Sequence, residues 1–193
     1  MVWQETPSPG YPLAAMSFQD LNLRTLTPAR LWRSLDAEER MLAARALFTH
    51  AWGDPSARRE GEMAIARALR FREEAVRKLP VDKRAGYLAK AVQPADSLAG
   101  SMLLALHLEE RRGLLSAFLD ALGIPHEGGM IAEDHTMTPP GTDALARATE
   151  ALDARFPSRE VDVYLASLLA LDPGSWEGLA DVLETRSGSR AAG

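Results

Sequence analysis

Residues 98–122 form the most apolar stretch of the chain and constrain its fold more than any other segment. Leucine and methionine are frequent in the first half, and leucine and phenylalanine are frequent in the second half. The charged segment 109–113 separates the two halves. A surface helix carries one apolar stripe, whereas these two runs are apolar on most of their circumference. We therefore predict two helices that other elements surround.

The charged segment 109–113 predicts where these two helices separate. A single helix from residue 95 to residue 122 would be about 42 Å long, which is more than a core of this size covers. Gly113 can also lie inside an unbroken helix, at a cost of about 1 kcal/mol relative to alanine. We favour the turn, and expect an antiparallel hairpin at the centre of the fold.

Proline and capping residues mark the expected helix starts. Proline fits the first helical turn, where its missing N–H has no intrahelical partner. Six prolines occupy such positions: Pro28, Pro55, Pro80, Pro94, Pro157 and Pro173. Asp54 and Asp172 are candidate N-caps, and Asp36 with Glu39 three residues later predicts a capping box.

These signals predict an all-α fold. The expected helices cover residues 28–34, 37–50, 55–78, 81–92, 95–108, 111–122, 142–155, 158–170 and 173–185. No segment has the alternation of β-branched residues that is typical of a strand. We expect about nine helices in antiparallel hairpins, arranged as an irregular bundle or as a short helical-repeat-like array.

The domain organisation follows from the helical pattern. Residues 1–26 read as a flexible N-terminal extension, in which Met16 is an alternative start to Met1. Residues 27–186 read as one helical domain, and residues 187–193 as a disordered tail. The first residues lack the charged and apolar segments of a secretory signal, and no apolar run reaches the length of a membrane span. The chain has no cysteine, which excludes disulfides, and we expect a cytoplasmic protein.

Two segments 77 residues apart resemble each other. The pairs are Pro80 and Pro157, Tyr87 and Tyr164, Leu88 and Leu165, and Ala89 and Ala166. Such a resemblance can mark a degenerate helical-hairpin repeat. Leucine and alanine are common in any helix, so a compact irregular bundle stays the favoured arrangement.

Residues 58–84 carry nine basic and five acidic side chains, although the chain as a whole has a net charge of −5. Glu73 with Arg77, and Glu74 with Lys78, have the favourable i,i+4 order, so part of this charge is paired within its own helix. We expect this stretch to be a solvated face or to contact an acidic protein partner, rather than nucleic acid, because acidic residues interleave with the basic ones. The candidate contact residues are Arg59, Arg67, Arg70 and Arg77.

Residues 123–141 form the longest segment without helical pattern and hold two of the four histidines. His126 and His135 each neighbour carboxylates, and His107 can supply a third ligand to a divalent transition metal. The spacing matches no helix-borne metal motif, so a solvated surface loop anchored by Met130 and Ile131 is the simpler interpretation. His107 itself reads as a residue at the edge of the core.

The sequence assigns no catalytic residue and no cofactor. It contains no G-x-S-x-G motif and no phosphate-binding loop. We therefore expect a non-enzymatic module for protein interaction or scaffolding. The alternative is a metal-binding protein or metal-dependent enzyme that uses the 123–141 loop together with His107.

Overall fold

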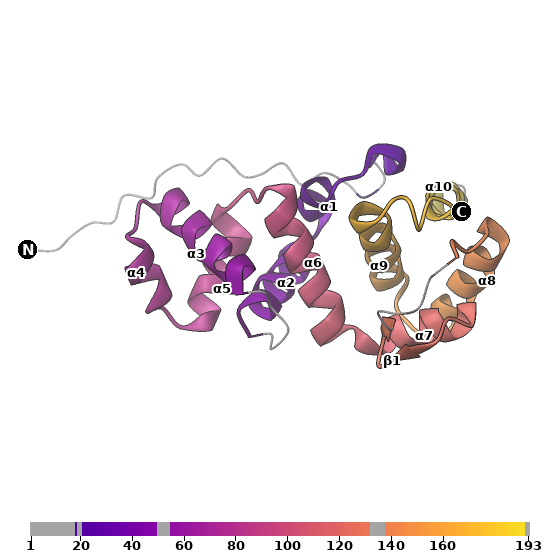
Figure 1. Ribbon diagram of the computed structural model, residues 1–193. Helices are drawn as coiled ribbons and strands as arrows, with labels where there is room; N and C mark the ends of the chain where they lie inside the picture. The colour runs from indigo at the N-terminus through magenta and orange to yellow at the C-terminus, as the bar shows by residue number, and fades with distance from the viewer. Residues whose placement is uncertain (1–17, 19–20, 50–54, 132–137, 192–193) are drawn as a thin grey trace, which may run out of the picture.

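The computed structural model describes residue 18 and residues 21–49, 55–131 and 138–191, which form a predominantly helical molecule (Figure 1). The elements are η2 (Leu23–Thr25), α1 (Pro28–Ser34), α2 (Ala37–Thr49), α3 (Pro55–Leu69), α4 (Glu73–Arg77), α5 (Val81–Ala91), α6 (Asp96–Glu110), α7 (Arg112–Leu122), β1 (His126–Glu127), β2 (Met130–Ile131), α8 (Thr142–Asp153), α9 (Ser158–Leu171) and α10 (Leu179–Ala191). The predicted all-α fold is confirmed.

Most of the predicted helix starts are confirmed. Pro28 is the first residue of α1, and the Thr27 side chain accepts a hydrogen bond from the Arg30 backbone N–H. The capping box of α2 is present, since Asp36 Oδ1 accepts from Glu39 N at 2.8 Å and Glu39 Oε2 accepts from Asp36 N at 3.0 Å. Asp54 lies outside the described residues.

The predicted helix over residues 55–78 is wrong, because the chain breaks between α3 and α4. Arg70 has a φ of 55°, in the left-handed region. The Phe71 N–H donates to Ala66 O at 2.9 Å, which is the bond that closes a Schellman motif. Glycine usually occupies the left-handed position, and an arginine there gave no sequence signal.

The predicted antiparallel hairpin of residues 98–122 is also wrong in its direction. The helices separate at Arg111, inside the expected segment, but α7 leads away from α6 (Figure 1). α6 packs mainly on α2 and α1, whereas α7 packs mainly on α8. α6 is buried on most of its circumference, except at half-exposed Leu104. α7 keeps an exposed face with Asp120 and Ala121, so the expected burial on all sides is not found there.

Three further expectations need correction. α10 begins at Leu179, because Pro173 lies in a turn whose Ser175 N–H donates to Asp172 Oδ1 at 3.2 Å. The same helix extends to Ala191, beyond the residue at which we expected the domain to end. The two-residue strands β1 and β2 pair antiparallel where no strand was predicted.

One apolar core runs through the described part of the molecule. At one end lie α2, α3, α4 and α5, at the other end lie α7, α8 and α10, and α1, α6 and α9 lie between them (Figure 1). Leu21, Leu23 and Leu26 pack on this core, although residues 1–26 were expected to form a flexible extension. Residues 1–17 of that extension lie outside the described residues.

Three buried carboxylates join helices that are distant in sequence. Glu39 of α2 pairs with Arg159 of α9 at 2.8 Å, and Glu62 of α3 pairs with Arg84 of α5 at 2.6 Å. Asp162 of α9 accepts from Arg186 of α10 at 3.0 Å. Each pair therefore fixes the position of one helix against another.

The 77-residue resemblance does not extend to packing. Pro80 and Pro157 are both N-cap residues, of α5 and α9. α5 packs mainly on α2, however, while α9 packs on α10, α1 and α6.

Within the described ranges, no helix is long and apolar enough to cross a lipid bilayer.

Candidate functional site

The structure describes two of the three histidines of the proposed metal site, and each of the two contacts a different residue. His107 is buried in α6, while His126 in β1 contacts Asp120 of α7, with Nε2 and Oδ1 3.2 Å apart. His126 Nδ1 accepts from the Gly129 N–H at 3.1 Å. His135 lies outside the described residues, and those described contain no group of three or more His, Asp or Glu that could hold a metal. Metal binding by this loop therefore remains an untested hypothesis.

The described part of the 123–141 loop is docked on α7. Met130 and Ile131 are partly buried and line one cavity with leucines of α7. Ile124, at the start of the loop, packs on the main apolar core. Gly129 has a φ of 89°, and a Cβ on it would lie 2.9 Å from Leu115 Cβ. Glycine is thus required here both for its backbone conformation and for its small size.

Replacing Gly129 by alanine is expected to undock the hairpin of β1 and β2. The substitution adds a steric overlap to a left-handed conformation that costs about 1–2 kcal/mol for a residue with a Cβ. Amide hydrogen exchange should become at least tenfold faster across residues 126–131. Gly128→Ala is the matched control, since Gly128 has a φ of 57° but its Cβ would have only Arg112 Cδ nearby, at 4.0 Å. Equal exchange in the two variants would contradict close docking.

An apolar cavity of about 380 Å³ lies where α6, α7, α9 and the hairpin meet. Six leucines line it: Leu104 and Leu108 of α6, Leu115 and Leu119 of α7, and Leu168 and Leu171 of α9. Leu104 is 50% exposed and Leu171 is 39% exposed, so apolar side chains also reach the surface here. A mostly apolar hollow of this size is typical of sites for small molecules.

His107, Tyr164 and Ser167 are the polar residues in the cavity wall. His107 Nε2 lies 2.9 Å from Ser167 Oγ, and this hydroxyl lies 2.7 Å from Val163 O. A serine hydroxyl has one proton, and only that proton can bond the carbonyl oxygen. Ser167 Oγ therefore accepts from the His107 Nε2–H, and His107 Nδ1 carries a free lone pair.

His107 Nδ1 is enclosed and has no hydrogen-bond partner among the described residues. Burial, with a smaller contribution from Arg111, lowers the pKa of His107 to about 3. The imidazole is therefore neutral at neutral pH, with one nitrogen acting only as an acceptor. An enclosed acceptor without a donor costs free energy, about 1–3 kcal/mol in proteins.

Tyr164 supplies the other polar group of this wall. Its ring meets the His107 ring edge to face with centroids 5.2 Å apart, and burial raises the pKa of its phenol. The phenol is therefore neutral, and its hydroxyl makes no hydrogen bond to any described residue. The cavity wall is thus mostly apolar, and its polar residues His107, Tyr164 and Ser167 are almost fully buried.

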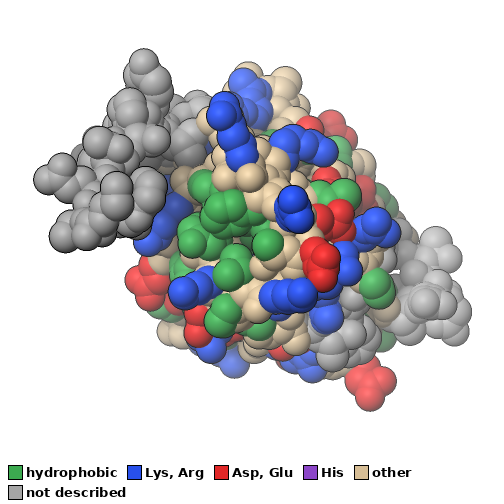
Figure 2. Space-filling view, turned by 90° about the vertical axis from the view of Figure 1, so that its left-hand side faces the viewer, with side chains coloured by type: hydrophobic (Ala, Val, Ile, Leu, Met, Phe, Trp, Pro, Cys, Tyr) green, Lys and Arg blue, Asp and Glu red, His purple; other side chains and the backbone are tan. Residues whose placement is uncertain are grey.

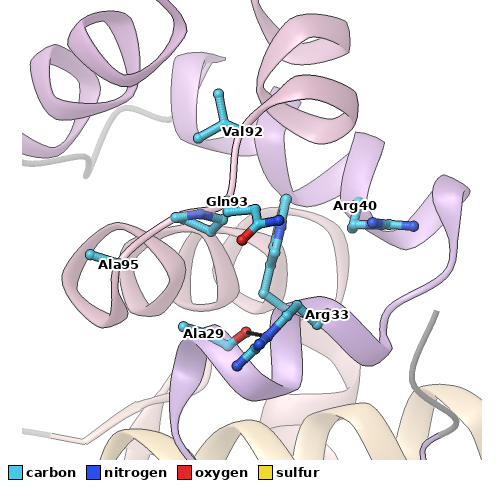
Figure 3. Close-up of a pocket in the computed structure, with 8 residues that line it drawn as sticks. Ala29, Arg33, Arg40, Val92, Gln93 and Ala95 are labelled. Carbon is cyan, nitrogen blue, oxygen red and sulfur yellow. Dashed lines mark hydrogen bonds between the residues drawn. The ribbon is translucent and has the colours of Figure 1, made fainter. Parts of the chain in front are cut away.

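A second hollow of about 320 Å³ lies between α1, α2 and the α5–α6 connection (Figure 3). Arg33 and Arg40 are its charged residues, and two cations at one hollow can bind an anion. Figure 3 shows that the two guanidinium groups do not come together. Arg33 Nε donates to Ala29 O and Arg40 Nε donates to Asp36 O, both at 3.3 Å. This arrangement gives no preformed anion site.

The four candidate contact arginines fall into two classes. Arg59 and Arg77 both pair with Glu73, at 3.4 and 2.8 Å. Arg67 and Arg70 are exposed and make no ion pair with any described residue. The i,i+4 pair of Glu74 with Lys78 is also present, at 2.9 Å, so the predicted pairing within α4 is confirmed.

Phe71 directly follows Arg70 in the chain, and its N–H donates to the backbone oxygen of Ala66, the residue before Arg67. The Phe71 side chain is 46% exposed. Its ring meets the Tyr87 ring edge to face, with centroids 6.2 Å apart. Figure 2 shows hydrophobic side chains gathered on this end of the molecule, with lysines and arginines around them. We refer to Phe71, Tyr87, Arg67 and Arg70 as the Phe71 face.

Sequence reasoning missed Ser167, Tyr164 and Phe71 as functional candidates. Ser167 and Tyr164 lie on an apolar helix and are far in sequence from His107, so only the tertiary fold brings them together. Phe71 follows Arg70, whose left-handed backbone turns the chain out of α3 and leaves the ring half exposed.

Comparisons with models of protein families, with curated proteins and with solved structures find no match to this chain.

Proposed function

We propose that the protein is a non-enzymatic interaction module whose Phe71 face binds an acidic segment of another protein. The observation that carries this proposal is the half-exposed aromatic ring of Phe71, which follows two exposed arginines within four residues of the chain. Neither arginine has an ion-pair partner among the described residues. The proposed partner segment carries carboxylates for the arginines and one large apolar side chain for the aromatic pair.

The charges support an acidic partner. Glu73 is already bonded by Arg59 and Arg77, so it does not neutralise Arg67 or Arg70. Cations at the edge of an interface accelerate association and select partners of opposite charge. Arg67 and Arg70 therefore favour a partner with carboxylates at matching positions.

The aromatic pair supports an apolar anchor at the centre of the contact. Binding energy in interfaces concentrates in a few residues, among which tyrosine and arginine are enriched. Phe71 and Tyr87 offer an edge-to-face pair onto which an apolar side chain can pack. Nucleic acid is a weaker candidate, because carboxylates such as those of Glu73 and Glu74 lie on the adjacent helix α4.

Selection from a random peptide library on the immobilised protein tests this function. We expect the enriched peptides to combine several acidic residues with an aromatic or large aliphatic residue. Phe71→Ala should weaken the affinity of a selected peptide about tenfold, as expected for loss of an interface anchor. Arg67→Glu should weaken it several-fold and reduce its dependence on salt concentration.

The matched control is Arg147→Glu on α8, an exposed arginine that makes no ion pair with any described residue. It changes the net charge equally and should leave peptide affinity unchanged. The proposal is wrong if enriched peptides lack an acidic bias, if both charge reversals weaken binding equally, or if duplex DNA binds more tightly than the peptides. Concentration-dependent dimerisation that Phe71→Ala abolishes would assign the face to a second copy instead.

A further inference from the structure

We propose that the acidic segment bound by the Phe71 face is an α-helix that lies along α5 and presents two carboxylates seven positions apart. This helix is a more specific form of the partner proposed above, so the inference rests on that proposed function. Two lysines of α5 lie at matching positions, and between them is a glycine against which no described atom packs.

α5 has one covered side and one uncovered side. The covered side packs on α2 and α3 and contains fully buried Ala85 and Leu88. Lys83 and Lys90 are exposed, and they lie one helical turn before and one turn after Tyr87. Because Tyr87 belongs to the Phe71 face, the uncovered side of α5 continues that face.

The two lysines are available to a partner. Neither Lys83 nor Lys90 makes an ion pair with any described residue. Asp82 neighbours Lys83 in the chain, but it already pairs with Arg45 of α2, with Nε and Oδ1 3.4 Å apart. Positive charge therefore lies on both sides of Tyr87 along the axis of α5.

A helical partner matches the spacing of these lysines. Lys83 and Lys90 are about 10.5 Å apart along the helix axis, at the usual rise of about 1.5 Å per residue. Positions i and i+7 of a second helix have the same spacing and the same side, with positions i+3 and i+4 between them. Carboxylates at i and i+7 can thus each meet one lysine, while an apolar residue between them reaches the aromatic pair.

An extended partner matches the spacing less well. In a β-strand, a distance of about 10 Å covers three residues. Side chains three positions apart point to opposite faces of the strand, so only one of the two carboxylates would face α5. The lysine spacing therefore favours a helix.

Gly86 supports a close approach of the second helix. It lies between the two lysines in sequence, and a Cβ on it would have no described atom within 4 Å. Its φ is not positive, and glycine is a poor residue for a helix interior, so the described structure gives no reason for glycine here. The missing side chain allows a second backbone to come closer than the usual distance of about 8–10 Å between helix axes.

Two synthetic peptides of identical composition test the register. Both have about 18 residues in an alanine-rich sequence, a length that supports a helix in water. The first carries glutamates seven positions apart, with leucines three and four positions after the first glutamate. The second carries the glutamates five positions apart, which turns them to different sides of the helix. In fluorescence anisotropy, we expect the first peptide to bind the wild-type protein about tenfold more tightly.

Gly86→Ala separates binding from folding. Alanine favours the helix, so the urea midpoint of this variant should rise. The added methyl group should nevertheless weaken binding of the first peptide about fivefold, because it keeps the second helix at a distance. Gly113→Ala in α7 is the matched control, since a Cβ at Gly113 would also have no described atom within 4 Å. It should leave the affinity unchanged.

A charge exchange tests the contact at one end of α5. Lys90→Glu should weaken binding of the first peptide about tenfold. Replacing one of the two peptide glutamates by lysine should restore the affinity for this variant. The glutamate whose replacement succeeds gives the direction of the bound helix.

The possible results separate this inference from the proposed function. The helical register is wrong if the two peptides bind equally, if Gly86→Ala leaves the affinity unchanged, or if neither lysine replacement restores binding. Equal binding of both peptides that Phe71→Ala weakens would overturn the register and keep the acidic partner. Both proposals fail if neither peptide binds and the library yields no acidic peptides. A dimer of the wild-type protein that Gly86→Ala dissociates would assign α5 to a second copy and overturn the inference.

Discussion

Replacing Glu39 by alanine is expected to lower the free energy of unfolding by about 3 kcal/mol, the lower end of the range for breaking a buried ion pair. Glu39 is 5% exposed and accepts two hydrogen bonds from Arg159, at 2.8 and 3.1 Å. Its carboxylate also closes the capping box with Asp36, and Arg111 lies 3.9 Å away. The substitution therefore removes a helix cap and leaves buried Arg111 with less compensation. Urea denaturation measures the change.

Glu38→Ala is the matched control for this substitution. Glu38 is the preceding residue in the first turn of α2, and it is exposed. Its replacement should change stability by no more than about 0.5 kcal/mol. Similar losses in the two variants would show that the charge of the helix start matters, rather than the pairing of Glu39 with Arg159.

Replacing Phe118 by alanine is expected to cost about 3–5 kcal/mol, the usual range for a fully buried aromatic side chain. Phe118 is fully buried in α7, where its ring centroid lies 5.5 Å from that of Tyr164 and 5.8 Å from that of Trp176. The truncation leaves a cavity between α7, α9 and the turn before α10. Thermal and urea denaturation should both show this loss of stability.

Phe71→Ala makes the same chemical change at the surface and is the control for Phe118→Ala. Because the Phe71 ring is half exposed, we expect a loss below about 1 kcal/mol. A loss at Phe71 as large as at Phe118 would contradict its description as a free surface residue. It would also make the peptide experiment uninformative about binding by this ring.

Local signals made the helix starts predictable. A proline at the first turn and the Asp36–Glu39 capping box act within a few residues, so the sequence contains the whole interaction. The end of α7 follows the same logic, because Gly123 adopts the left-handed conformation there with a φ of 67°. Arg70 makes the same turn without glycine, and for that reason the break between α3 and α4 was missed.

Directions and long-range partners were not predictable from local signals. The position of the break between α6 and α7 follows from charge, but the direction of α7 depends on where α8 packs. Arg111 illustrates the difficulty, since its charge suggested an exposed turn, yet it is buried between Glu39 and Glu160. Only residues distant in sequence make that burial favourable.

In the candidate sites, too, nearby residues predicted some features, while others depend on the tertiary fold. The basic stretch was recognised from composition, but only the tertiary structure shows that Arg59 and Arg77 are paired. Arg67 and Arg70 have no ion-pair partner within the described ranges. His107 was expected at the edge of the core, but it is buried and bonds Ser167, 60 positions away. A sequence pattern cannot assign the tautomer of a histidine whose partner lies on another helix.

The pairing of Glu39 with Arg159 also bears on the order of events during synthesis. The two residues are 120 positions apart. A ribosome that adds about 5–20 residues per second therefore releases Arg159 roughly 6–24 s after Glu39. In that interval the nascent chain can form the local capping box of α2, but it lacks the cation that α9 supplies. We expect α2 to complete its burial only after α9 has emerged, so translation itself delays the packing of α2 against the middle of the molecule.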